Sequence, residues 1–106
     1  MELSKRDNTL DCALATPMVS IIMPAYRVAK YIGAALDSVL AQTFTDYEII
    51  VVNDGSPDTL ELNRALAPYR DHIVYIEQEN RGCSAARNTA IRVARGRYIA
   101  LLDPDD

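Results

Sequence analysis

The sequence predicts an α/β domain with a mainly parallel sheet and helices on both of its faces. Short apolar runs rich in strand formers occur at residues 19–23, 47–52, 72–76 and 98–102. The segments between them carry apolar residues at helical spacing, and the connections are short. Such alternation specifies parallel strands joined by right-handed crossovers. We therefore expect a Rossmann-like, three-layer arrangement in the order β-α-β-α-β-α-β, truncated after its fourth strand.

The N-terminal part of the chain, residues 1–17, is polar and without a pattern, so we expect a flexible lead-in there. The first strand follows and is closed by Pro24, because proline cannot donate to a sheet ladder. A helix of about four turns comes next, since apolar residues recur at helical spacing at Val28, Ile32, Leu36, Val39 and Leu40.

The second strand, residues 47–52, contains four consecutive apolar residues, as expected of a strand that is covered on both faces. The Asp54-Gly55 pair that follows is also a common hairpin signal. The next apolar residues favour a helix over a hairpin, because they recur at helical spacing: Leu62, Ala65, Leu66 and Tyr69. Asp58 and Glu61 indicate a capping box at the start of this helix.

The third strand, residues 72–76, leads through a polar loop to a helix over residues 84–95. If Ser84 is the N-cap of that helix, Arg87 lies in its first turn, where a cation opposes the helix dipole. An arginine makes sense there beside a bound anion, and phosphate is the usual anion at a helix start. The alternatives are that Arg87 points to solvent or pairs with Glu79.

The fourth strand runs into the carboxylates of Asp103, Asp105 and Asp106, with Pro104 ending the ladder at about Asp103. If the backbone stays extended, Asp103 and Asp105 project to the same side. Paired carboxylates call for a cation between them, and a hard divalent ion such as Mg²⁺ fits. The alternative is a solvated acidic loop. Whether Asp105 or Asp106 is the main ligand is left open.

Net charge, composition and the absence of certain motifs argue against several classes of function. A net charge of −4 argues against a nucleic-acid polymer as partner. The single histidine, His72, leaves no basis for a Ser-His-Asp triad or a histidine zinc site. The GxGxxG and GxxxxGK[ST] motifs are absent. No run reaches the length of a membrane span, and residues 1–7 lack the apolar core of a secretory signal, so we expect a cytoplasmic protein.

The candidate site lies at the carboxyl ends of the strands, where open α/β sheets bind ligands. Four loops should meet there, at residues 24–27, 53–56, 79–82 and 103–106. A phosphate site and a divalent-metal site on one sheet edge imply a nucleotide or a sugar phosphate as ligand.

Four motifs, in this order and spacing, make the chain resemble the inverting family 2 glycosyltransferases of GT-A fold. They are VSIIMPAY at 19–26, VNDGS at 52–56, NRGCSAARN at 80–88 and LDPDD at 102–106. The resemblance covers residues 18–106 and implies the nucleotide-sugar-binding half of such an enzyme, with residues 1–17 as the lead-in.

The resemblance also implies roles for individual residues. Pro24, Ala25 and Tyr26 would line the nucleoside pocket, and Asp54 with Gly55 would bind the base, usually uracil. Arg87 would lie near the nucleotide, and Asp103-Pro104-Asp105 corresponds to the DxD motif, with Asp103 toward the ribose and the later acid toward Mn²⁺ or Mg²⁺. The implied donor is a nucleotide-diphospho-sugar, a UDP-sugar in the first instance. The implied acceptor is a saccharide or a lipid-linked molecule of polysaccharide biosynthesis.

Family members continue past the DxD motif into an acceptor-binding half that carries the general base, which would lie beyond Asp106 here. We therefore expect this chain alone to be inactive. We also expect its last strand to lack neighbours and to favour self-association. For a full-length protein, the inner face of a membrane is left open as location.

Other functions remain as alternatives. One is a nucleotidyltransferase or sugar-nucleotide pyrophosphorylase, which would share the sheet and the metal but would need a Gly-rich loop after the first strand. A receiver-type signalling domain would need paired acids after that strand, and the sequence has none there. The third is a nucleotide-binding stub without catalysis.

Overall fold

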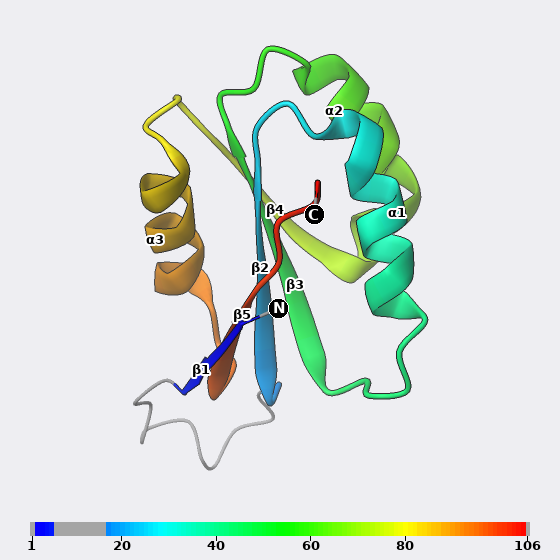
Figure 1. Ribbon diagram of the computed structural model, residues 1–106, viewed down its shortest axis with the longest axis vertical. Helices are drawn as coiled ribbons and strands as arrows, with labels where there is room; N and C mark the ends of the chain where they lie inside the picture. Colours follow the sequence, from blue (N-terminus) through cyan, green and yellow to red (C-terminus); the bar gives the residue numbers. More distant parts are fainter. Residues whose placement is uncertain (1, 6–16, 106) are drawn as a thin grey trace.

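The computed structural model describes residues 2–5 and 17–105, which form a five-stranded sheet with flanking helices (Figure 1). The elements in chain order are β1 (Glu2–Lys5), β2 (Val19–Ala25), α1 (Ala29–Leu40), β3 (Tyr47–Asp54), α2 (Thr59–Leu66), the 3₁₀ helix η2 (Ala67–His72), β4 (Ile73–Gln78), α3 (Cys83–Val93) and β5 (Tyr98–Leu101). The strands lie in the order β1-β5-β2-β3-β4.

The strands β5, β2, β3 and β4 form the parallel part of the sheet. Ile22 of β2 pairs with Ile50 of β3, and both side chains are fully buried. Such strands need continuous hydrophobicity because helices cover both faces of a parallel sheet. The predicted α/β fold with a mainly parallel sheet is therefore confirmed.

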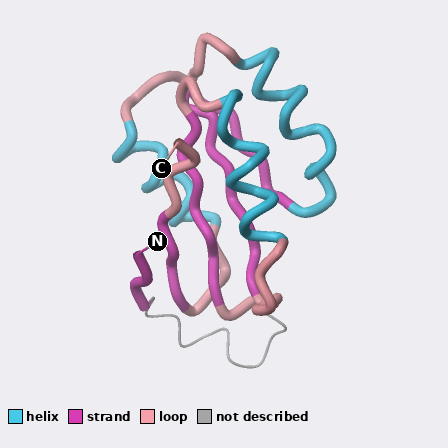
Figure 2. The backbone as a smooth tube through the Cα atoms, turned by 45° about the vertical axis from the view of Figure 1, so that its right-hand side comes forward, coloured by secondary structure: helices cyan, strands magenta, loops and turns pink. Residues whose placement is uncertain are grey.

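The helices form two outer layers, with α1 and α2 on one face of the sheet and α3 on the other (Figures 1 and 2). Side chains alternate along β2, so Ile21 and Met23 enter the core beneath α1 and α2, while Ile22 enters the core beneath α3. The small residues Ala86 and Ala90 face the sheet from α3. In the part of the chain that the structure describes, no helix is long and apolar enough to cross a membrane.

Strand β1 was not predicted. Residues 1–17 were expected to form a lead-in without regular structure, but Glu2–Lys5 pairs antiparallel with β5. A strand at this position satisfies backbone groups of the β5 edge, and main-chain pairing requires no particular side-chain pattern. The sequence therefore carried no signal for it. On this side β5 has a neighbour, contrary to the expectation of a bare edge, and residues 6–16 lie outside the described residues.

Two helix starts differ from the prediction. The N-cap of α3 is Gly82 rather than Ser84, so Arg87 falls in the second turn instead of the first. The capping box at Asp58 and Glu61 is also absent, because the Asp58 side chain makes no cap hydrogen bond to α2. That carboxylate bonds elsewhere: its Oδ2 accepts a hydrogen bond from the backbone N–H of Ala29, at the start of α1 (3.1 Å).

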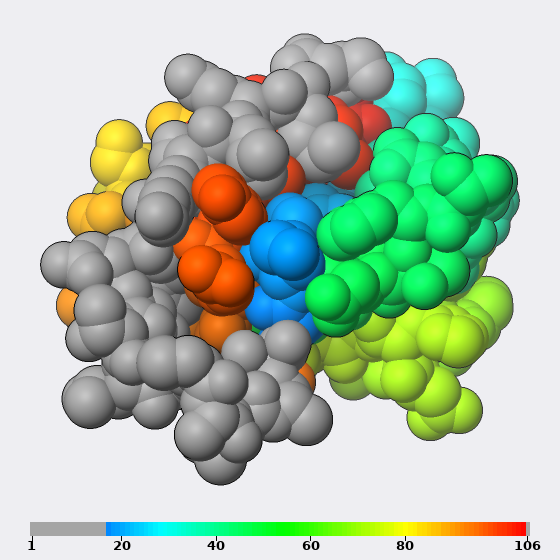
Figure 3. Space-filling view, turned by 90° about the horizontal axis from the view of Figure 1, so that it is seen from below, coloured from blue at the N-terminus to red at the C-terminus, as the bar shows by residue number. Residues whose placement is uncertain are grey.

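The amino-terminal end of the sheet is held together by polar contacts. The start of β2 lies between the segment that leads into β5 and the α1–β3 connection (Figure 3). Its Ser20, fully buried, donates a hydrogen bond to Glu48 (2.5 Å) and accepts one from the backbone N–H of Gly96 (2.8 Å). These contacts join the starts of the parallel strands. The candidate site lies at the opposite end of the same strands.

Candidate functional site

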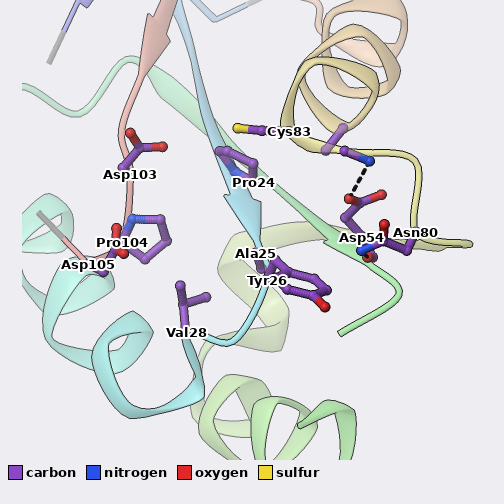
Figure 4. Close-up of a pocket in the computed structure, with 12 residues that line it drawn as sticks. Pro24, Ala25, Tyr26, Val28, Asp54, Asn80, Cys83, Asp103, Pro104 and Asp105 are labelled. Carbon is purple, nitrogen blue, oxygen red and sulfur yellow. Dashed lines mark hydrogen bonds between the residues drawn. The ribbon is translucent and has the colours of Figure 1, made fainter. Parts of the chain in front are cut away.

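A cavity of about 470 Å³ opens at the carboxyl ends of the parallel strands. Asp103 and Asp105 stand on one wall, and Asp54 and Asn80 stand on the opposite wall (Figure 4). Its lining consists of Pro24, Ala25, Tyr26, Val28, Asp54, Asn80, Gly82, Cys83, Ala86, Asp103, Pro104 and Asp105. Loops that are far apart in the sequence therefore meet as predicted.

The floor of the cavity comes from the end of β2. Pro24 and Ala25 are buried there, whereas Tyr26 is 43% exposed and presents an aromatic ring at the cavity. The turn that follows is tight, because Arg27 has a φ of 58°, which is uncommon for a residue other than glycine. The Ser56 hydroxyl accepts a hydrogen bond from the backbone N–H of Arg27 at 2.7 Å and so ties this turn to the loop after β3.

Asp54 is the most tightly held charged group of the site. It is 3% exposed and ends β3 in register with Gln78 of β4. Its Oδ1 accepts hydrogen bonds from Gln78 Nε2 (3.0 Å) and the backbone N–H of Arg81 (2.9 Å), and its Oδ2 accepts one from the backbone N–H of Gly82 (2.9 Å). The carboxylate thus gathers the loop between β4 and α3 around itself.

These contacts also decide the ionisation of Asp54. Burial alone raises the pKa of a carboxyl group, because it disfavours the charged form. Here the hydrogen bonds from Gln78, Arg81 and Gly82 outweigh burial and hold the pKa of Asp54 below its ordinary value. The group is therefore an ionised, acceptor-only carboxylate at neutral pH.

Gly55 does not line the cavity but allows the loop to pack. Its φ is +64°, and a Cβ built on it would meet the backbone nitrogen of Asn80 at 2.6 Å. Asn80 in turn donates a hydrogen bond from its side chain to the backbone carbonyl of Asp54 (3.0 Å). Glycine is required here because both the backbone conformation and the close approach exclude a side chain.

The acidic wall follows β5, which ends at Leu101, earlier than the predicted Asp103. The backbone N–H of Leu102 still donates to Ile22 O (3.0 Å), and the chain then turns at Pro104 and Asp105. The backbone therefore does not stay extended through Asp105, so the condition for placing both side chains on one side of a strand is not met. The turn nevertheless leaves Asp103 and Asp105 on the same cavity.

A metal ion would find two carboxylates at this wall. Within residues 2–5 and 17–105, no cluster of three or more His, Cys, Asp or Glu side chains could hold a metal by itself. Asp103 is half-buried and Asp105 is exposed, while Asp106 lies outside the described residues. Two carboxylates fit an ion such as Mg²⁺ that takes its other oxygens from water and a bound phosphate.

Arg87 lies away from this cavity. It lines a second hollow of about 300 Å³ between α3 and β5, together with Ser84, Asn88, Ile91, Ile99 and Leu101. Its Nε is buried and has no hydrogen-bond partner in the described part of the chain. The structure thus unites six of the predicted site residues and leaves Gly55 and Arg87 outside the lining.

Sequence analysis predicted that the loop 79–82 reaches the site, but it assigned no role to Asn80, Gly82 or Cys83. Asn80, Gly82 and Cys83 line the cavity because the polar loop after β4 folds back over Asp54. Gln78 was also missed, since strand β4 was expected to end at Ile76. The signal available for Gly82 was its place before an apolar helical stripe, where glycine occurs as an N-cap.

Comparison with known proteins identifies the family. The model of glycosyl transferase family 2 matches residues 20–106. An uncharacterized glycosyltransferase of Bacillus subtilis, EpsJ, is 50% identical over 91 residues, which are 85% of this chain and 26% of EpsJ. In eight of the curated relatives that it matches, the chain spans between 13% and 28% of the relative's length.

Solved structures of similar fold agree with this match. A mannosyltransferase of Pyrobaculum calidifontis, in complex with GDP-Man and Mn²⁺, is 31% identical with a TM-score of 0.73, over 85% of this chain and 28% of that protein. Residues 1–349 of TarS from S. aureus, in complex with UDP-GlcNAc, are 30% identical with a TM-score of 0.68, over 82% of this chain and 26% of that protein. The chain belongs to glycosyl transferase family 2.

Proposed function

We propose that this chain forms the donor-binding part of a glycosyltransferase and binds a nucleotide-diphospho-sugar together with a divalent metal. The whole enzyme would transfer the sugar to an acceptor hydroxyl on a saccharide or a lipid-linked molecule. One observation supports the proposal above others: an aromatic ring, a buried ionised carboxylate and an acidic wall share one cavity at the carboxyl edge of the sheet. Ligands of open α/β sheets bind at this edge.

The proposed role of Asp54 is to read the base. An ionised carboxylate only accepts hydrogen bonds, so it favours a base whose ring nitrogen on the pairing edge carries an N–H over a base whose ring nitrogen there is an acceptor and whose donor is only an exocyclic amino group. Uracil and guanine carry a ring N–H on that edge, whereas cytosine and adenine carry a ring acceptor. The ligands of the two structural neighbours, UDP-GlcNAc and GDP-Man, are of the first kind. We propose a UDP-sugar as donor, with Tyr26 and Pro24 beside the nucleoside.

The proposed metal ligands are Asp103 and Asp105, with Asp103 also near the ribose. Mn²⁺ or Mg²⁺ held there would supply positive charge that stabilises the diphosphate as it leaves. The ion in the mannosyltransferase complex, Mn²⁺, supports this choice. The two aspartates would orient the diphosphate end of the donor, while Asp54 holds the base at the other wall.

We propose further that this chain alone binds a donor without transferring it. The carboxylates that line the cavity are Asp54, Asp103 and Asp105, and each has a proposed binding role. A general base for the acceptor hydroxyl is needed in addition. We expect that base in the part of the longer relatives that this chain does not match.

Arg87 remains a proposed contact of the diphosphate. Its buried Nε has no partner among the described residues, and a change of rotamer would be needed to bring the guanidinium to the cavity. Arg87→Met should then weaken binding of UDP more than binding of uridine, which has no phosphate. An equal effect on both ligands would show that Arg87 acts on the fold.

Calorimetric titration of the chain with UDP, with and without Mn²⁺, tests the proposal. We expect metal-dependent binding by the unaltered chain and loss of at least about tenfold in affinity for Asp54→Ala, since a charge-assisted hydrogen bond is removed. Asp105→Ala should lose the dependence on Mn²⁺. Asp71→Ala, which removes an exposed carboxylate of η2, is the matched control and should bind normally.

GDP, CDP and ADP serve as competing ligands in the same titration. We expect UDP and GDP to bind more tightly than CDP and ADP, because of the ring N–H. If the folded chain binds none of these nucleotides in the presence of Mn²⁺, donor binding by this chain is refuted.

A further inference from the structure

We propose that Gln78 and Thr89 form a hydrogen-bond relay that positions the Asp54 carboxylate for its ligand. The relay links three elements: Thr89 lies on α3, Gln78 ends β4 and Asp54 ends β3. Neither Gln78 nor Thr89 lines the cavity, so both would act through Asp54 as positioning residues.

The direction of each hydrogen bond follows from the ionised carboxylate. Asp54 Oδ1 can only accept, so the Gln78 side chain must present its amide N–H₂ toward it, at 3.0 Å. This orientation turns Gln78 Oε1 toward the Thr89 hydroxyl, which lies 2.6 Å away. The hydroxyl is therefore the donor in that contact.

The Thr89 hydroxyl has a second acceptor close by, the backbone carbonyl of Ala85 one turn earlier on α3 (3.0 Å). A hydroxyl carries one hydrogen, so the two acceptors compete for it. The shorter contact is the one to Gln78 Oε1. Thr89, held in place by α3, thus orients the amide of Gln78, and that amide in turn orients the Asp54 carboxylate.

The orientation of the Asp54 carboxylate determines which of its lone-pair positions can accept a hydrogen bond from a ligand. A carboxylate offers about four lone-pair positions. Oδ1 accepts from Gln78 and from the Arg81 backbone, and Oδ2 accepts from the Gly82 backbone, which leaves a position on Oδ2. We infer that this position receives the N–H of the base. A partial rotation of the carboxylate about its Cβ–Cγ bond would turn this lone-pair position away from the base.

The effect on nucleotide binding rests on the proposed function, but the relay itself does not. Its direct readout is the titration of the Asp54 carboxyl carbon, followed by NMR in the ligand-free chain. The variants are Gln78→Met, which removes the amide, and Thr89→Val, which keeps the branched shape and removes only the hydroxyl. Thr89→Ser restores the hydroxyl, and Thr43→Val removes an exposed threonine hydroxyl from the loop after α1 as a control.

The titratable and charged groups on the strand ends and loops at this edge of the sheet and on the first half of α3 are not substituted in these variants. They are Tyr26 and Arg27 after β2, Asp58 after β3, Glu77, Glu79 and Arg81 on and after β4, Cys83 and Arg87 on α3, and Asp103 and Asp105 after β5. A change in the titration of Asp54 can therefore be attributed to the relay.

We expect the pKa of Asp54 to rise in Gln78→Met, because a donor to the charged form is lost. It should rise less in Thr89→Val and return to the original value in Thr89→Ser. A pKa that is the same in the unaltered chain, Gln78→Met and Thr89→Val would overturn the relay. If Gln78→Met does not fold, Thr89→Val decides alone.

Calorimetric titration with UDP and Mn²⁺ at pH 7 measures the effect on binding. We expect affinity to fall about tenfold in Gln78→Met and about threefold in Thr89→Val, as for loss of a hydrogen bond. A shifted pKa with unchanged affinity would overturn the ligand-positioning role. A shifted pKa in a chain that binds no nucleotide would uphold the relay and reject the proposed function.

Discussion

Asp58 Oδ2 accepts a hydrogen bond from the backbone N–H of Ala29 at 3.1 Å, so the carboxylate at the start of α2 caps the start of α1. The N-cap residue of α1, Val28, has no side chain that could do so. The second oxygen of Asp58 accepts a hydrogen bond from the Ser56 hydroxyl. That hydroxyl in turn accepts a hydrogen bond from the backbone N–H of Arg27. One carboxylate thus fixes the turn that carries Tyr26 into the cavity.

Asp58→Ala should lower the free energy of unfolding by about 1–2 kcal/mol, the usual cost of losing a helix cap. Urea denaturation followed by circular dichroism measures it. The control is Asp71→Ala, whose exposed side chain should contribute less than about 0.5 kcal/mol. Equal losses in the two variants would show that the cap between the helices contributes nothing to stability.

Gly55→Ala should be strongly destabilising, by about 1–3 kcal/mol, because a Cβ at φ +64° meets the Asn80 backbone at 2.6 Å. Gly33→Ala is a matched control inside α1, where the new Cβ meets only Tyr69 Oη at an ordinary 3.8 Å. We expect Gly33→Ala to stabilise the chain by about 0.5–1 kcal/mol. Urea denaturation of both variants tests this, and a destabilised Gly33→Ala together with a neutral Gly55→Ala would contradict the predicted packing.

The elements of the fold could be predicted because they depend on local patterns. Continuous apolar runs mark the parallel strands, and helical spacing marks α1 to α3. Strand ends were less predictable: β3 and β4 extend to the polar residues Asp54 and Gln78, because the ladder is formed by the backbone. The same reason explains why β1 was missed.

The candidate site was predictable only as a set of loops. Topology brings residues 24–26, Asp54 and the acids after β5 to one sheet edge, and the cavity contains them. The hydrogen bonds that shape the site join residues distant in the sequence, such as Asp58 with Ala29 and Asp54 with Gly82. No local pattern encodes such pairs. The position of Arg87 within α3 also differs from the prediction, because the helix has Gly82 rather than Ser84 as its N-cap.

The pKa of Asp54 predicts an acid-dependent component of stability. Because the folded-state pKa lies below the ordinary value of 3.8, the unfolded chain binds more protons in this range. The contribution is fully present above the ordinary value and is lost as the pH falls through the lower, folded-state value. Urea midpoints measured from pH 6 to pH 3 should fall less steeply in Asp54→Asn than in the unaltered chain. Parallel curves would exclude a lowered pKa for Asp54.

Metal and nucleotide should bind to this chain cooperatively. Asp103 and Asp105 provide two carboxylates, and no larger cluster of metal-ligating side chains occurs in the described ranges 2–5 and 17–105. An ion that needs about six oxygens must therefore take several from the diphosphate and water. Calorimetry should show Mn²⁺ binding at least about tenfold tighter with UDP present, and UDP should gain the same factor from Mn²⁺, since such coupling is reciprocal. Asp105→Asn should abolish the coupling while Asp71→Asn preserves it. Tight Mn²⁺ binding without nucleotide would instead require ligands beyond these two aspartates.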